Sequence, residues 1–160
     1  MLTVNIICVG NLKEKYLKDA VAEYEKRLRA FCKFNIIELA EQKLPDNPSN
    51  SEIKSALLKE AEKITAKIQK GSAVIPLAIE GKELSSEQLA NKFNDFSLKG
   101  VSTLSFIIGS SFGLDNSIKQ SADMLLSMSP MTFPHQLARL MLCEQVYRAF
   151  SINNNTKYHK

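Results

Sequence analysis

Short apolar runs alternate with longer amphipathic stretches along the first hundred residues. The runs at 2–9, 33–40 and 73–79 are rich in β-branched and aromatic residues, which predicts buried strands. Apolar residues recur at helical spacing between and after these runs, so a helix is expected to follow each strand. Three strand–helix units in succession favour an α/β fold, in which a parallel-rich sheet carries helices on both faces. Residues 1–160 are expected to form a single domain.

Local sequence signals sharpen this pattern. Capping boxes at Ser49–Glu52 and Ser85–Gln88 predict the starts of the second and third helices. Pro76 indicates a sheet edge or a bulge in the third strand, because proline cannot donate to a strand ladder. The tripeptide 80–82, Glu-Gly-Lys, is expected to turn the chain after that strand.

Two loops after residue 100 are candidates for a ligand site. The predicted strand 102–108 leads into the small-residue loop 109–113, and the apolar run 124–128 leads into the loop 129–133. In open α/β sheets, ligands bind beyond the carboxyl ends of the strands. Both loops are therefore expected to border the same crevice.

The loop 109–113 also matches G-x-S-x-G, the nucleophile elbow of α/β-hydrolases. Against that function, the chain is short for the hydrolase fold, the turn is prolonged where a helix should open, and only His135 and His159 could serve as base. A small serine hydrolase acting through Ser111 stays open as an alternative. The simpler interpretation is a turn of small residues that a backbone or ligand approaches closely.

The last helix, whose start is marked by Thr132 and Pro134, is apolar around most of its circumference from residue 137 to 150. Such a helix must be covered on nearly all sides, which favours a homodimer interface over a central helix of a monomer. Glu144 and Arg148 stand one helical turn apart and are expected to form an ion pair.

The polar tail ends in Tyr158 and His159 between two lysines. A polar chain end is usually frayed and solvated. An aromatic side chain flanked by cations also suits stacking on a nucleobase while phosphates are held nearby.

Bulk composition narrows the classes of protein. The net charge of +4 permits a polyanionic partner without requiring one. Three scattered cysteines and two distant histidines support neither a disulfide framework nor a metal site. No apolar run is long enough to cross a membrane, so a cytoplasmic protein with buried cysteines is expected.

Five segments together resemble one family. They are Ile79–Lys82, Phe106–Gly109, Met131–Gln136, Glu144–Phe150 and Tyr158–Lys160. Over its whole length the chain resembles the small bacterial SPOUT-class methyltransferases that N3-methylate a pseudouridine of 23S ribosomal RNA in the large subunit. The resemblance implies a C-terminal trefoil knot, one of the rare exceptions to unknotted topology. It also implies a homodimer whose substrate is the assembled large subunit or the ribosome, and S-adenosylmethionine bound in the knot without a metal.

The resemblance also carries over site residues. Arg148, Tyr158 and His159 are implied to lie near the target nucleotide and to reach the cofactor of the other subunit. From residue type we assign Arg148 to charge or phosphate contact, Tyr158 to stacking or positioning, and His159 to proton handling. A non-catalytic ribosomal RNA-binding module is the remaining alternative. The implied cofactor-binding residues are Leu77, Gly109, Met128, Ser129, Pro130, Met131, Thr132 and Phe133.

One position departs from the family pattern. The family usually has Gly-Gly after Phe-Ile-Ile, whereas Ser110 is the second residue here. If this position required a positive φ, a serine would be strained there.

Overall fold

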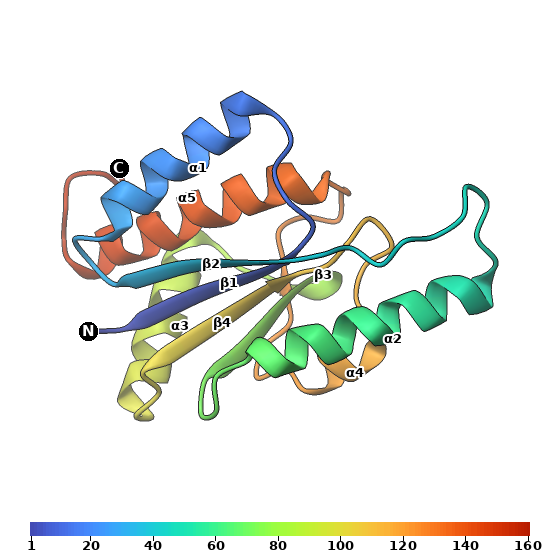
Figure 1. Ribbon diagram of the computed structural model, residues 1–160. Helices are drawn as coiled ribbons and strands as arrows, with labels where there is room; N and C mark the ends of the chain where they lie inside the picture. The colour runs from blue at the N-terminus through green and yellow to red at the C-terminus, as the bar shows by residue number, and fades with distance from the viewer.

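The structure, a computed structural model, describes residues 1–160. It contains one sheet with strand order β2-β1-β4-β3-β5, in which all neighbouring strands are parallel (Figure 1). The predicted parallel α/β sheet is confirmed. The strands are β1 (Thr3–Val9), β2 (Lys33–Leu39), β3 (Ala73–Glu83), β4 (Thr103–Ile108) and β5 (Leu126–Ser127).

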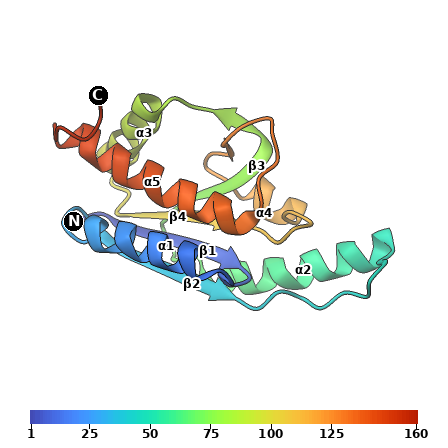
Figure 2. The same ribbon diagram turned by 90° about the horizontal axis from the view of Figure 1, so that it is seen from above.

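Helices cover both faces of the sheet, as predicted. On one face α5 (His135–Asn153) packs against α1 (Lys15–Leu28) and α3 (Ser86–Leu98), and it lies between them in Figure 2. The other face is covered by α2 (Asn50–Lys67) and the short α4 (Asn116–Gln120). Both predicted capping boxes are formed, by Ser49 with Glu52 and by Ser85 with Gln88. None of the helices combines the length and the apolar character that a bilayer crossing requires.

Alternation along the central strands divides the core into two layers. Ile6, Phe106 and Ile75 belong to the cluster under α1, α3 and α5, whereas Ile7 and Ile107 belong to the cluster under α2 and α4. Strands with apolar side chains on both faces are typical of a sheet that is covered on both sides. This explains why the strands appear as continuous apolar runs in the sequence.

The three cysteines lie in the core, as predicted. Cys8, Cys32 and Cys143 are buried and free. Burial raises the pKa of each of these thiols to about 12. They therefore stay protonated at neutral pH and act as small apolar side chains.

The predicted turn at 80–82 is wrong, because β3 continues to Glu83. Its pairing with β4 ends at Pro76, and its pairing with β5 begins at Leu77 and resumes at Lys82 after a register shift. The bulge or strand edge that Pro76 predicted is therefore present as this register shift, which begins at the residue after Pro76. The partner that extends β3 is a two-residue strand more than forty positions later, so local sequence could not reveal the extension.

Residues 123–126 pass against β3 in close contact. The amide of Asp123 donates to the carbonyl of Val74, and the amide of Lys82 donates to the carbonyl of Leu125, both at 2.9 Å. A side chain at Gly81 would place its Cβ only 2.8 Å from the carbonyl carbon of Leu125, so only glycine fits there. This passage is consistent with the knot that the family resemblance implies.

The last helix begins later than Thr132. It starts at His135, Pro134 is its N-cap, and no side chain caps it. The carbonyl of Pro134 accepts the first helical hydrogen bond, from the amide of Ala138 at 2.9 Å.

We predict that Phe93→Ala lowers the free energy of unfolding by about 3–5 kcal/mol. Phe93 is 2% exposed, and its ring lies 6.1 Å from Phe106 of β4 and 5.4 Å from Phe150 of α5, centroid to centroid. The substitution therefore opens a cavity where α3, the sheet and α5 meet. Urea unfolding followed by circular dichroism measures the loss. The matched control is Leu98→Ala on the same helix, because Leu98 is 87% exposed; a loss as small as the control's would contradict this packing.

Candidate active site

A cavity of about 540 Å³ opens beyond the carboxyl ends of β3 and β4. Its walls come from β3, from the loop after β4, from the loop between β5 and α5, and from the first turns of α5. Both loops proposed from the sequence border it. Seven of the eight predicted cofactor residues line the cavity, and Pro130 does not; the seven are Leu77, Gly109, Met128, Ser129, Met131, Thr132 and Phe133.

The register shift in β3 creates one wall of the cavity. Residues 78–80 lie in the gap between the two pairing points with β5, and all three line the cavity. Glu80 forms an ion pair with Lys119 of α4 at 2.5 Å, and both side chains belong to the lining. The hydrogen bond from Lys119 lowers the pKa of the Glu80 carboxyl below its usual range. The sequence motif marked Glu80, but nothing in the sequence paired it with Lys119.

The loop after β4 is held tightly from within. A Cβ at Gly109 would lie 2.7 Å from the carbonyl carbon of Gly113 and 2.9 Å from Leu114 Cδ2, so a side chain there must displace the loop. The amide of Gly113 donates to the carbonyl of Ser110 at 2.9 Å, and Gly113 has a φ of +89°. Gly109 and Gly113 are thus required for different reasons, close approach and backbone conformation.

Ser110 is not strained, because its φ is not positive. Its hydroxyl donates to Glu60 Oε1 at 3.1 Å, and the amide of Gln42 donates to Glu60 Oε2 at 2.8 Å. Glu60 is buried on α2, so these bonds connect the cavity loop to the helix layer behind the sheet. The serine that replaces the second glycine therefore has a hydrogen-bond partner in Glu60. Sequence analysis could not identify this partner, because it lies fifty residues away.

The hydrolase alternative finds no support in this geometry. The residues after β4 form a closed loop, and the next helix begins only at Asn116. Ser111 and His135 both line the cavity, yet no hydrogen bond joins Ser111 to His135 or to His159. A nucleophile elbow needs a serine on a strand-to-helix turn with a histidine base, and this arrangement is absent.

The loop before α5 leaves backbone donors available. Met131 N–H donates to the hydroxyl of Ser129 at 3.0 Å, whereas the amides of Ser129, Thr132 and Phe133 donate to no backbone carbonyl. Backbone groups near a ligand pocket that are unpaired in the protein are suited to bind polar ligand atoms. The cavity thus combines apolar walls with free main-chain donors.

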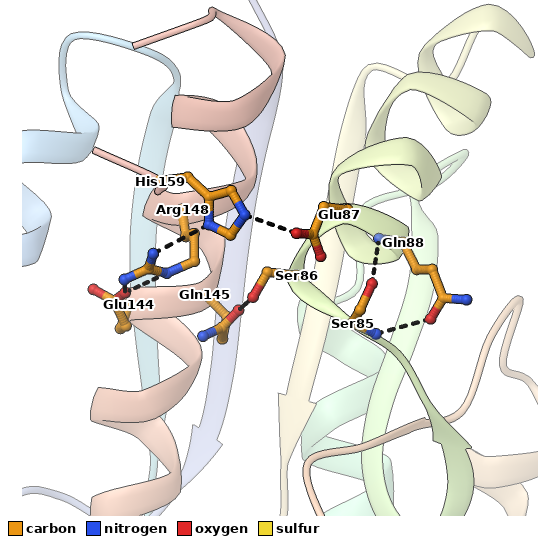
Figure 3. Close-up of polar contacts among 8 residues, drawn as sticks. All are labelled: Ser85, Ser86, Glu87, Gln88, Glu144, Gln145, Arg148 and His159. Atoms are coloured by element: carbon orange, nitrogen blue, oxygen red, sulfur yellow. Dashed lines mark hydrogen bonds and ion pairs between the residues drawn. The ribbon is translucent and has the colours of Figure 1, made fainter. Parts of the chain in front are cut away.

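The C-terminal tail is folded back rather than frayed. The amide of Thr156 donates to the carbonyl of Ser151, which returns the chain toward α5. The hydroxyl of Tyr158 donates to Glu144 at 2.7 Å, and the Tyr158 ring centroid lies 4.7 Å from the Arg148 guanidinium. His159 lies between Arg148 and Glu87 of α3 (Figure 3). The three residues predicted to be catalytic are therefore brought together.

Glu144 is the centre of this tail cluster. The predicted ion pair with Arg148 is formed at 2.6 Å. Burial opposes ionisation of Glu144, but hydrogen bonds from Tyr24, Tyr158 and Arg148 outweigh it and hold the pKa of the carboxyl below its usual range. Glu144 is therefore ionised at neutral pH, and its carboxylate holds the tail through Tyr158.

The cavity lies at the first turns of α5, whereas the tail cluster lies along its second half. His135 lines the cavity, whereas Arg148 contacts the tail, and the two residues are thirteen positions apart. At 1.5 Å per helical residue this is roughly 20 Å along the axis. No residue of the tail lines the cavity of its own chain.

The structure belongs to the general class of parallel α/β proteins, in which ligands bind beyond the carboxyl ends of the strands. Comparison of the sequence with known protein families identifies the particular family. The family model described as "Predicted SPOUT methyltransferase" matches residues 2–159, and the chain belongs to this family.

Relatives of known name match along the full length. A protein of Streptococcus equi subsp. zooepidemicus named ribosomal RNA large subunit methyltransferase H is 50% identical over 159 residues, covering 99% of this chain and 100% of that protein. A relative of the same name from Bifidobacterium adolescentis is 52% identical with the same coverage. A Methanococcus maripaludis relative, 51% identical over the same span, has that name preceded by "putative".

A solved structure supports the fold. A probable methylase family protein from Haemophilus influenzae superposes with a TM-score of 0.54 over 98% of this chain and 70% of its own. At 13% identity the likeness concerns the fold alone.

We predict that Glu144→Gln destabilises the protein most above the unfolded glutamate pKa of about 4.3. Because the folded-state pKa of Glu144 is lowered, its stabilising contribution is complete above that value and is lost as the pH falls through the folded-state pKa. The difference in unfolding free energy between wild type and variant should therefore shrink as the solution is acidified. Urea titrations at several pH values measure it, and a difference that is independent of pH would contradict the assignment.

Proposed function

We propose that this chain is an S-adenosylmethionine-dependent methyltransferase that N3-methylates a pseudouridine of 23S ribosomal RNA in the assembled large subunit or ribosome. It acts in the cytoplasm as a homodimer and uses no metal. The observation that carries the proposal is the identity of about half of all residues, over the whole chain, with proteins named as methyltransferases of large-subunit ribosomal RNA.

The cavity fits the proposed cofactor in size and character. Its volume of about 540 Å³ lies within the range of roughly 300–1,000 Å³ for small-molecule sites. Leu77, Ile108 and Phe133 offer apolar surface, and the amides of Thr132 and Phe133 are free to meet polar edges of a nucleoside. S-adenosylmethionine supplies an activated methyl group when bound, so the protein must mainly align the reacting atoms.

The tail supplies the groups that the target base requires. Arg148 is held by Glu144 and presents a fixed positive charge, which suits a phosphate or a developing negative charge on the imide. The Tyr158 ring offers a face for stacking. His159 is 27% exposed and can exchange a proton with a bound base.

The proposed dimer joins the two halves of the site. No residue of the tail lines the cavity of its own chain, so in the proposed dimer a second copy brings its tail to the cavity. The apolar side chains of Ile79, Met131 and Leu137 are exposed in the single chain, at or beside the cavity. Covering them by an identical chain would bury this surface and complete the site.

We predict that purified protein transfers a labelled methyl group from S-adenosylmethionine to pseudouridine N3 in large subunits or ribosomes that lack the modification. Mass spectrometry of digested ribosomal RNA locates the product. The mild positive charge supplies little non-specific affinity for RNA, so transfer to protein-free ribosomal RNA should be much slower. Equal rates on both substrates would contradict recognition of the assembled particle.

We also predict that a chain truncated before Lys157 still binds S-adenosylmethionine but transfers no methyl group. The tail does not line its own cavity, so its loss should leave the cofactor affinity within about threefold, a difference below 1 kcal/mol. Calorimetric titration measures the binding.

The control is Ser111→Ala, which removes the proposed hydrolase nucleophile. It should retain methyl transfer, whereas loss of an esterase activity in this variant would favour the hydrolase. A pure RNA-binding module would transfer no methyl group in any form of the protein.

A further inference from the structure

We infer that Glu87 is a positioning residue for His159, which it holds as the Nε2–H tautomer so that Nδ1 can accept the N3 proton of the target base. This inference rests on the proposed function and deepens it. The sequence did not single out Glu87, which is separated from His159 by 72 positions.

The hydrogen bonds determine the tautomer. Arg148 Nη1 lies 3.3 Å from His159 Nδ1, and an arginine can only donate. Nδ1 must therefore be the unprotonated acceptor, and the ring proton resides on Nε2. Nε2–H then donates to Glu87 Oε1 at 2.8 Å (Figure 3). A carboxylate on one ring nitrogen and a lone pair on the other are the arrangement of an oriented general base.

Glu87 is itself held in place. It lies in the first turn of α3, where the capping box of Ser85 and Gln88 fixes the helix start at 3.1 and 2.8 Å. Ser86 donates to Gln145 of α5 at 2.7 Å, which ties this turn to the helix that bears Arg148. The Glu87 backbone amide and the His159 ring together lower the pKa of the Glu87 carboxyl, so the carboxylate is charged at neutral pH. The helix N-terminus favours that charge as well.

The step balances as follows. When the target base displaces Arg148 from Nδ1, its N3–H bond breaks and an Nδ1–H bond forms. The electron pair left on N3 would form the new bond to the methyl carbon, while the carbon–sulfur bond breaks and sulfur keeps the two electrons of that broken bond. The resulting imidazolium is flanked by the Glu87 carboxylate, which stabilises it, and His159 is exposed enough to return the proton to water.

Charges from three elements face His159. Glu87 comes from α3, Arg148 comes from α5 with Glu144 behind it, and Lys157 and Lys160 are its neighbours on the tail. Glu87 is the carboxylate in direct contact with the ring. Removing its charge should therefore destabilise the imidazolium that the proton transfer forms.

The test is Glu87→Gln, assayed for methyl transfer to modification-free large subunits between pH 5 and 9. We expect kcat to fall about 10- to 100-fold, with an unchanged KM for the particle and unchanged affinity for S-adenosylmethionine. The rising limb of the pH–rate profile should move to lower pH. Glu62→Gln, an exposed site on α2 across the sheet, is the matched control and should behave as wild type.

Two further measurements separate positioning from a general structural role. In a His159→Ala background, Glu87→Gln should lower kcat no further, because the imidazole that Glu87 positions is already absent. Nitrogen chemical shifts of the two histidines should show the Nε2–H tautomer for His159 in wild type and a mixture in Glu87→Gln. An unchanged kcat and pH limb, or a full additional loss in the His159→Ala background, would overturn the inference while leaving the proposed function intact. Absence of methyl transfer by wild type would instead overturn the proposed function and the base role with it.

Discussion

The position of α5 is the constraint on which the rest of the structure depends. At its first turns the buried Arg139 donates to Glu38 at 2.7 Å and to the carbonyl of Gly10 at 3.1 Å, which pins the helix to the ends of β2 and β1. At its far end Phe150 packs between Phe31 and Phe93. A buried guanidinium deprived of its partners is costly, so this attachment also fixes the direction of the helix.

Two separate hydrogen-bond systems hold the two halves of the proposed site. One holds the cavity loop through Ser110 and Glu60, and the other holds the tail through Glu144 and Glu87. The two systems share no residue: the first joins the loop after β4 to α2, and the second joins the tail to α5 and α3. In the proposed function the first serves the methyl donor and the second serves the nucleotide, so only assembly of two chains would bring them together.

The sequence predicted those features whose causes are local. β-Branched runs became strands, and both capping boxes became helix starts, because backbone preference and short-range hydrogen bonds determine them. The extension of β3 and the Ser110–Glu60 bond depend on partners far along the chain, so pattern analysis missed them.

The strand pattern predicted where the candidate site lies, at the loops 109–113 and 129–133, whereas its individual cofactor residues were predicted through family resemblance. The residues that line its cavity come from several separate elements, so they form no single sequence motif. The sequence did not reveal the role of Glu87 either, because a glutamate in the first turn of a helix is common. Its importance appears only when the tail folds onto α3 and places His159 beside it.

The measurement that tests the two-chain site most directly is complementation in mixed dimers. Gly109→Ala should disable the cofactor loop, and truncation before Lys157 should remove the tail, so each variant alone should transfer no methyl group. After co-refolding in equal amounts, a shared site predicts roughly a quarter of wild-type activity, because half of the dimers gain one intact site of two. If the mixture stays inactive although mixed dimers form, each chain must use its own tail, and the account of a site built by two chains is contradicted.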